Sequence, residues 1–339
     1  MIIDGQAHMN HVSYLEWLSE KGGAEGKRRA ERMRDAAKRR PAGMNVGERL
    51  AMMDRNNIDF QVVTPDGGGG LPADDPAAAL TIARVINDGM MKLREESNGR
   101  LIAGGTVPLT DFKQRGSKEM TRAVKDLGLK AITIPSSVKG QPLDTPVFEP
   151  FWAQAAELDV PIYIHPNTPE QHRDRVYEGD WDLSHVFGME LDMVLFFSRL
   201  VFSGIMDRYP TLKVVGHHLG GGLPFWLGRV NETYDLSNPS HDTTAKNVRK
   251  FLTKPLLDYF SLFYYDTAVG GSGPAIRCAY EVVGADQILL ATDAPHGPGS
   301  GEVRLATYPK VIKSLGLPEA DTEKILAGTA KRLLNLELD

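Results

Sequence analysis

The stretch FQVVTPDGGGGLPADDPAAALTIARVINDGMMKLREESNGRLIAGGTV, residues 60–107, contains a complete strand–helix–strand unit. Its two ends, 60–64 and 101–107, are short apolar runs with several β-branched residues, which predict buried strands. Residues 75–96 between them carry apolar side chains at helical spacing, and Asp75 followed by proline predicts the helix start. Two strands joined through a helix are typical of a parallel sheet.

The same alternation continues along the chain and indicates the fold class. Helical patterns follow at 118–128, 147–159 and 273–284. Eight strands alternating with helices predict an α/β protein of the (β/α)8 TIM barrel class, formed as a single domain over residues 1–339. An open doubly wound sheet is the alternative, although the Gly-rich turn of that class is absent after the first strand. The predicted strands are 2–3, 60–64, 101–107, 131–134, 161–165, 213–217, 262–266 and 288–293.

Two insertions, after strands one and five, interrupt this alternation. The first, residues 9–58, is expected to form a helical arm or lid, and its segment 21–40 carries nine Lys/Arg against three Asp/Glu. That charge predicts either a solvated helix or a cover that attracts an anionic substrate. The second, residues 166–189, has a length typical of lids and partner surfaces. The glycines of DGGGG, 66–70, predict a flexible loop above the barrel mouth.

Composition excludes several classes of protein. Hydrophobic residues make up 42% of the chain and charged residues 24%, as in ordinary globular proteins. The formal charge of −5 argues against a nucleic-acid partner. No apolar run is long enough to span a membrane, and the start lacks the features of a signal peptide. The single cysteine, Cys278, cannot form an internal disulfide, so we expect a cytoplasmic protein.

Polar side chains follow the predicted strands where a barrel enzyme carries its active site, at the C-terminal strand ends. Several imidazoles and a carboxylate, with one position open, are the ligands of a catalytic divalent ion such as Zn²⁺ or Mn²⁺. We therefore predict one divalent metal ion at this rim. The candidate positions are Gln6, His8, His165, Asn167, His217, His218, Asp266 and Asp293.

Six motifs in order along the chain make it resemble the amidohydrolase superfamily. They are IIDGQAH (2–8), RLAMMDRNNIDFQVV (49–63), PIYIHP (161–166), VVGHHLGGGLPFWLGR (214–229), LLATDAP (289–295) and KILAGTAKRLLNL (324–336). The resemblance is to the branch containing aminocarboxymuconate-semialdehyde, γ-resorcylate and 5-carboxyvanillate decarboxylases and 4-oxalomesaconate hydratase.

This resemblance implies roles for particular residues. His8, His165 and Asp293 fall where the family holds its metal, and His218, rather than His217, matches a histidine that activates water or assists proton transfer.

Two arginines also match family positions. Arg49 and Arg229 match arginines that bind substrate carboxylates, Arg229 from a neighbouring subunit, which implies a homodimer or higher oligomer. A structural pairing for Arg49 and an interface role for Arg229 are the alternatives. The long helix expected at 191–208 offers a further interface element.

Gln6 departs from the family, which has His-x-His or Glu-x-His at this point. A glutamine oxygen can ligate a metal but is neutral and weaker than a carboxylate. Alternatively, Gln6 donates to a bound carboxylate or water, and the ion is held by the other ligands. We expect an occupied metal site, and a metal-free binding protein is the other reading.

The implied reaction is metal-dependent, non-oxidative decarboxylation of a small hydroxyaromatic or unsaturated carboxylic acid. Asp293 is the expected acid, helped by His218, while Asn167 and His296 are further candidates for substrate contact. If the metal delivers hydroxide instead, the same residues support hydrolysis of a lactone or amide, or hydration of a double bond. The segments at 165–169 and 191–213 favour decarboxylation.

Overall fold

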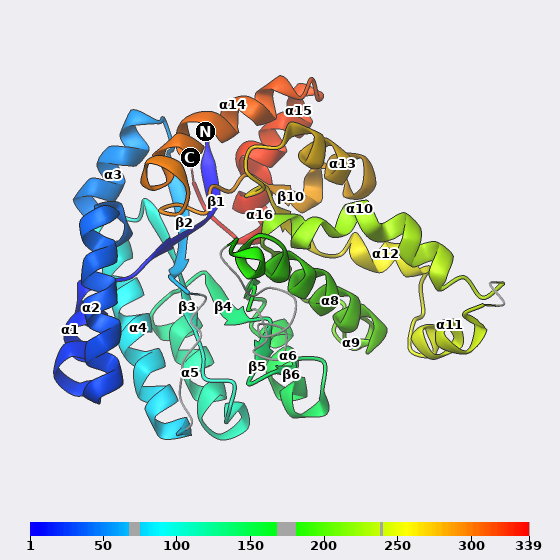
Figure 1. Ribbon diagram of the computed structural model, residues 1–339, viewed down its shortest axis with the longest axis horizontal. Coiled ribbons are helices and arrows are strands. Elements are labelled where there is room, and N and C mark those ends of the chain that lie inside the picture. The colour runs from blue at the N-terminus through cyan, green and yellow to red at the C-terminus, as the bar shows by residue number, and fades with distance from the viewer. Residues whose placement is uncertain (68–74, 168–180, 238–239, 339) are drawn as a thin grey trace.

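A sheet of eight parallel strands forms the centre of the molecule in the computed structural model, which describes residues 1–67, 75–167, 181–237 and 240–338 (Figure 1). Each strand pairs with the next one of the barrel, in the order β1-β2-β3-β4-β7-β8-β9-β10. The strands are β1 (Ile3–Met9), β2 (Phe60–Pro65), β3 (Leu101–Thr106), β4 (Ala131–Pro135), β7 (Ile162–His165), β8 (Val214–Gly216), β9 (Tyr264–Asp266) and β10 (Ile288–Leu289). A short antiparallel hairpin, β5 (Ser137–Val138) with β6 (Gln141–Pro142), follows β4.

The sheet closes into a barrel where β1 meets the segment after β10. The Gly5 N–H donates to the Leu290 carbonyl at 2.7 Å, and the Asp293 N–H donates to the Gln6 carbonyl at 3.0 Å. Gly5 allows this close approach, because a Cβ would lie 2.9 Å from the Leu290 carbonyl oxygen. The predicted α/β barrel is therefore confirmed, with all eight predicted strands present.

Helices surround the barrel on its outer face (Figure 1). Asp75 caps α4 as expected, its side chain accepting the N–H groups of Ala77 and Ala78. The helix expected over 191–213 is instead two helices, because Gly204 takes a left-handed φ of 73° between them. The helices after β2 are α4 (Pro76–Glu96), α5 (Ser117–Thr121), α6 (Glu149–Glu157), α8 (Met189–Phe202), α9 (Ile205–Arg208), α10 (His218–Thr233), α11 (Asp242–Arg249), α12 (Leu256–Phe260), α13 (Gly273–Val283), α14 (Glu302–Ser314), α15 (Glu319–Glu323) and α16 (Thr329–Leu333).

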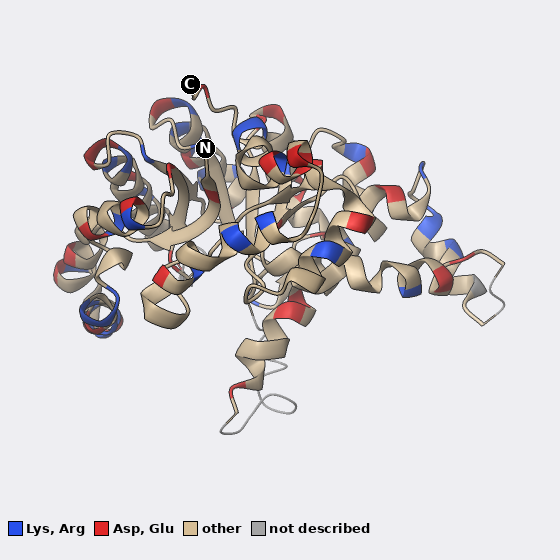
Figure 2. Ribbon diagram, turned by 90° about the horizontal axis from the view of Figure 1, so that it is seen from above, with Lys and Arg blue, Asp and Glu red and all other residues tan. Residues whose placement is uncertain are grey.

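The core has two parts because the strands are buried on both faces. One part fills the barrel and includes Ile3, Val62, Tyr163 and Val215. The other lies between the sheet and the helices and contains most of the buried apolar residues. Charged residues lie mainly on the outer helices, as Figure 2 shows. Among the helices that the structure describes, none is both long and apolar enough to cross a membrane.

The segment between β1 and β2 forms an arm of three helices, α1 (Val12–Lys21), α2 (Gly23–Arg39) and α3 (Val46–Arg55). Glu25 pairs with two of the arginines of basic α2, Arg28 and Arg32, in exposed contacts. The arm then turns back to the strand ends through Arg40. Of the other predicted insertions, 68–70 and 168–180 lie outside the described residues, and 181–188 ends in a helical turn, Ser184–Gly188.

Candidate metal centre and active site

Three side chains from distant parts of the sequence meet at the C-terminal ends of the strands. His8 comes from β1, His165 ends β7, and Asp293 follows β10. His8 Nε2 lies 3.2 Å from Asp293 Oδ1, and the ring centroids of His8 and His165 are 5.4 Å apart. The structure thus brings together the three residues that the sequence analysis assigned to the metal.

Hydrogen bonds on the far side of each ring fix which imidazole nitrogen faces the centre. Pro166 O can only accept, so His165 Nδ1 carries the proton in their 2.8 Å contact. His8 Nδ1 lies 3.1 Å from Thr64 Oγ1, whose hydroxyl donates to the Ala7 carbonyl. These contacts leave Nε2 of each ring available as a metal ligand, and His8 Nε2 faces Asp293 Oδ1.

The contacts around His8 Nε2 conflict in a way that a cation would resolve. This nitrogen lies 2.9 Å from Gln6 Nε2 and 3.2 Å from Asp293 Oδ1. A lone pair on this nitrogen would face a carboxylate oxygen, and either a proton or a metal ion between the two atoms removes that repulsion. Gln6 Oε1 is buried and has no hydrogen-bond partner in the described part of the chain. Turning the amide over would bring this oxygen to the cluster. Two imidazoles, a carboxylate and an amide oxygen fit a divalent ion such as Zn²⁺ or Mn²⁺.

Electrostatics at the cluster favour the ligand forms of His165 and Asp293. Burial lowers the pKa of His8, but the hydrogen bond and charge of Asp293 outweigh it and raise that pKa. Burial lowers the pKa of His165 to about 4, and the nearby His8 adds to the effect, so His165 is neutral at pH 7. Burial raises the pKa of Asp293, but the hydrogen bond with His8 and the charge of His218 outweigh it and hold the pKa well below its usual range. Asp293 is consequently ionised at neutral pH.

Arg304, which the sequence analysis did not select, anchors Asp293 from the other side. Its Nη1 donates to Asp293 Oδ2 at 3.0 Å and to the Thr292 carbonyl at 3.1 Å. One carboxylate oxygen is thereby held by Arg304 and the other faces His8. Arg304 lies in the first turns of α14, and only its position shortly after the last strand could have drawn attention to it.

A left-handed turn after β8 positions His218. Residues 218–222 all have positive φ, from 54° to 77°. Gly221 is required there because a Cβ would lie 2.0 Å from the Glu190 carbonyl oxygen. The turn sets His218 Nδ1 2.8 Å from Glu190 Oε1 and lets the His218 N–H donate to Asp266 Oδ1 at 2.8 Å.

The pKa of His218 follows from these contacts. Burial lowers this pKa. The hydrogen bond and charge of Glu190, and to a smaller extent the charges of Asp266 and Asp293, outweigh burial and raise the pKa to about 9. His218 is thus protonated at neutral pH, as an acid should be. Glu190, on α8, was not among the predicted site residues, because nothing in its local sequence links it to the turn after β8.

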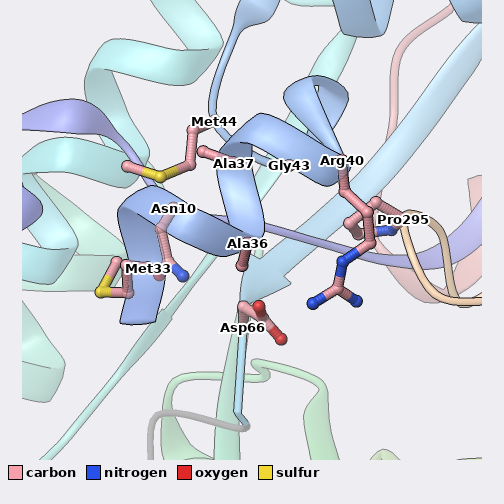
Figure 3. A pocket seen from close by; sticks show the side chains of 9 residues that line it. All are labelled: Asn10, Met33, Ala36, Ala37, Arg40, Gly43, Met44, Asp66 and Pro295. Carbon is pink, nitrogen blue, oxygen red and sulfur yellow. The ribbon is translucent and has the colours of Figure 1, made fainter. Parts of the chain in front are cut away.

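His296 connects the cluster to the helical arm. Arg40 Nη1 donates to His296 Nδ1 at 2.6 Å, and His296 Nε2 donates to Asp66 Oδ1 at 3.1 Å. Ligand atoms of His8, Asp293 and His296 all lie within 4.8 Å of one another. Figure 3 shows Arg40 and Asp66 lining one pocket beneath α2, with Pro295 at its edge. The basic arm therefore ends at the site.

Arg49 does not reach the cluster, and its geometry contradicts the expected contact with substrate. Its side chain is fully buried, and it donates to the carbonyls of Ala42 and His8 and to Gln61 Oε1, all within 2.8 Å. Gln61 in turn donates to the buried Asp4 carboxylate at 2.6 Å. Arg49 thus ties α3 to β1 and β2, which fits the structural pairing raised as its alternative.

The other two predicted contacts lie at the periphery. Arg229 is exposed on α10, beside the exposed Phe225 and Trp226. Asn167 is exposed just after β7, and its N–H donates to Ser136 Oγ and Asp192 Oδ2. Neither side chain is part of the cluster in a single chain.

Comparison with known proteins gives the family of the chain. The amidohydrolase family matches residues 3–336. The γ-resorcylate decarboxylase of Rhizobium sp. strain MTP-10005 is 29% identical over 297 residues, covering 85% of this chain and 86% of the relative. The 2-amino-3-carboxymuconate-6-semialdehyde decarboxylase of Dictyostelium discoideum is 28% identical over 295 residues, covering 85% and 76%.

Solved structures share the fold over nearly the whole chain. The 5-carboxyvanillate decarboxylase of Sphingomonas paucimobilis superposes with a TM-score of 0.81 at 24% identity, covering 99% of each chain. The dihydroxybenzoic acid decarboxylase of Polaromonas sp. JS666, solved with bound manganese and 2-nitroresorcinol, gives 0.79 at 23% identity, covering 100% of this chain and 98% of the other.

Proposed function

Because the chain belongs to the amidohydrolase family, we propose that it is an enzyme that removes the carboxylate of a hydroxyaromatic acid by metal-dependent, non-oxidative decarboxylation. The observation that carries this proposal is the meeting of His8, His165 and Asp293 at the strand ends, together with the contact of His218 Nδ1 with Glu190 Oε1 in the turn after β8. The relatives named decarboxylases, which match most of the chain, support the carbon–carbon lyase class.

The metal would be held by His8, His165 and Asp293, joined by the Gln6 oxygen once its amide is turned over. When bound, a divalent ion supplies a Lewis acid that draws in the carboxylate and the adjacent hydroxyl oxygen of the substrate. Manganese, present in the Polaromonas structure, is the first ion to test, and zinc is the second. Arg40, at the end of the basic arm, adds a cationic group at the rim for an anionic substrate.

His218 is the proposed acid, in place of the expected Asp293. Asp293 is ionised and anchored by Arg304, so it suits the role of ligand. His218 holds one proton at Nδ1 against Glu190 and carries the second at Nε2. Transfer of the Nε2 proton to the ring carbon forms the new C–H bond. The bond to the carboxylate then breaks, its electron pair returns to the ring, and carbon dioxide leaves.

The experiment is to incubate Mn²⁺-loaded and Zn²⁺-loaded protein with 2,6-dihydroxybenzoate, 5-carboxyvanillate and 6-methylsalicylate, and to follow carbon dioxide and products by mass spectrometry. We expect a product lighter by one carbon dioxide from at least one acid, and none from chelator-treated protein. A product heavier by one water would instead assign the hydratase alternative. Absence of both from metal-loaded, folded protein would contradict the proposal.

Homo-oligomerisation belongs to the same proposal. Arg229, exposed beside two exposed aromatic residues, is a candidate for contact with substrate across a subunit interface. Light scattering after size-exclusion chromatography tests this, since a monomer that is active would exclude such a contact.

A further inference from the structure

Asp266 ends β9 at the rim of the barrel, and the proposed reaction gives it no role. Its side chain is fully buried, although a carboxylate is unfavourable to bury without partners. One of its oxygens, Oδ2, has no hydrogen-bond partner among the described residues. The other, Oδ1, accepts two backbone N–H groups, from His218 at 2.8 Å and from Ala268 at 3.0 Å. Both hydrogen bonds of Asp266 thus go to the backbone, and one of them goes to the proposed acid.

The bond to His218 lies at the start of a strained turn. His218 and Leu219 carry side chains, yet their φ values are 55° and 54°, in the left-handed region that glycine adopts far more easily. The glycines 220–222 continue the turn with positive φ, and the Gly220 N–H donates to the His217 carbonyl at 2.8 Å. Strained backbone of this kind persists where surrounding groups hold it, so the turn needs an anchor outside itself.

Strand β9 can supply this anchor because it lies beside β8. Gly216 of β8 pairs with Tyr265 of β9, so the next residue, Asp266, is level with the first residues of the turn. Glu190 holds the same histidine at the other end of its side chain, through ring Nδ1. The bond from Asp266 therefore fixes the backbone of His218, and the bond from Glu190 fixes the rotation of its ring.

We propose that Asp266 is a positioning residue for the reaction, whose Oδ1 holds the turn after β8 in the conformation that aims His218 at the substrate. The inference rests on the acid role of His218 in the proposed function. What this role requires of residue 266 is an oxygen acceptor, and not a charge.

Two observations on Asp266 separate the acceptor from the charge. Burial raises the pKa of Asp266 to about 7, against the opposing charge of His218, so both forms of the carboxyl are accessible near neutral pH and Oδ1 can accept in each. Because Oδ2 has no partner in the described part of the chain, an amide nitrogen at that position would break no hydrogen bond there. Asparagine should therefore serve in place of Asp266.

The test compares Asp266→Asn, which keeps an oxygen acceptor, with Asp266→Ala, which removes it. Asp258→Ala, at an exposed position of α12, is the matched control and should follow the native enzyme. Rates are measured at pH 6 with metal-loaded enzyme, because His218 is largely protonated there with or without the charge of Asp266. We expect Asp266→Ala to lower kcat at least about tenfold, with KM and metal affinity changed less than about twofold, and Asp266→Asn to recover most of that loss.

Hydrogen exchange of a peptide covering 217–222, followed by mass spectrometry, gives a readout that does not depend on turnover. We expect faster exchange in Asp266→Ala than in the native protein or Asp266→Asn. Native kcat and native exchange in folded Asp266→Ala would overturn the proposal. If Asp266→Ala does not fold, a tenfold loss of kcat in folded Asp266→Asn would overturn it as well, because the acceptor is then present without effect. If the native enzyme decarboxylates none of the acids, the proposed function fails, and the exchange rates still decide whether Asp266 holds the turn.

Discussion

A Glu190→Gln variant removes the charge that keeps His218 protonated while preserving the shape of the side chain. Burial lowers the pKa of His218, and the 2.8 Å contact with Glu190 is the largest of the interactions that raise it to about 9. Without that charge we expect the pKa to return to near its ordinary value of 6.5.

The sign and size of the effect on activity follow from the acid role of His218. Activity is present below the pKa and is lost as the pH rises through it. At pH 8 a group of pKa 9 is about 90% protonated and one of pKa 6.5 about 3%, so we expect kcat to fall roughly thirtyfold. At pH 6 the same comparison gives a loss of less than twofold. A bound cation would lower the pKa of His218 equally in the native enzyme and in Glu190→Gln. The quantity tested is therefore the difference between the pH profiles of these two proteins.

The assay is the initial rate of decarboxylation by metal-loaded enzyme between pH 5.5 and 9, with Glu281→Gln as the matched control. Glu281 is exposed on α13, away from His218, and its variant should follow the native profile. Equal losses in Glu190→Gln at pH 6 and pH 8 would refute the assignment of His218 as acid. Such a result would indicate that Glu190 only supports the turn after β8.

Further predictions concern the cluster and its supports. His165→Ala and Asp293→Asn should each abolish turnover, and full activity of either in a steady-state assay would remove that residue from the metal centre. Gln6→Glu should raise metal affinity in a chelator competition if residue 6 is a direct ligand, and unchanged affinity would assign Gln6 to hydrogen bonding. Arg49→Met should lower the free energy of unfolding, measured by urea denaturation, by about 3 kcal/mol, because the buried carbonyls of Ala42 and His8 lose their donor. A raised KM with native stability would instead indicate that Arg49 contacts substrate. Arg304→Met should weaken metal binding severalfold by freeing Asp293 to rotate, measured by the same competition, and unchanged affinity would show that the carboxylate needs no anchor.

The barrel could be predicted from the sequence because its strands are short apolar runs separated by helical patterns, and because strand ends in such a fold share one rim. The same reasoning located His8, His165 and Asp293. It could not find Arg304 or Glu190, since both lie on helices whose approach to the rim depends on loop conformation. The left-handed turn that brings Glu190 next to His218 has no periodicity to reveal it.

Two errors came from patterns that specify position but not direction. The motif containing Arg49 fixes where the residue lies on α3, but not that its guanidinium donates to the His8 carbonyl and to Gln61 Oε1. The apolar pattern over 191–213 is continuous through Gly204, and only the left-handed φ of that glycine divides the helix. In both cases a local conformation overrode the sequence pattern.

The barrel closes where β1 meets the segment after β10, and the metal ligands come from both sides of this closure. Metal binding therefore requires both segments to be in place. His8 and Asp293 are 285 residues apart in the chain, yet they touch across the hydrogen bonds between β1 and the segment after β10. An ion shared by these residues would clamp the first and last strands, adding about 2.7 kcal/mol of stability at a hundredfold excess over its dissociation constant. A nascent polypeptide could not complete the clamp until its final strand had emerged, so loading with metal would coincide with the end of synthesis.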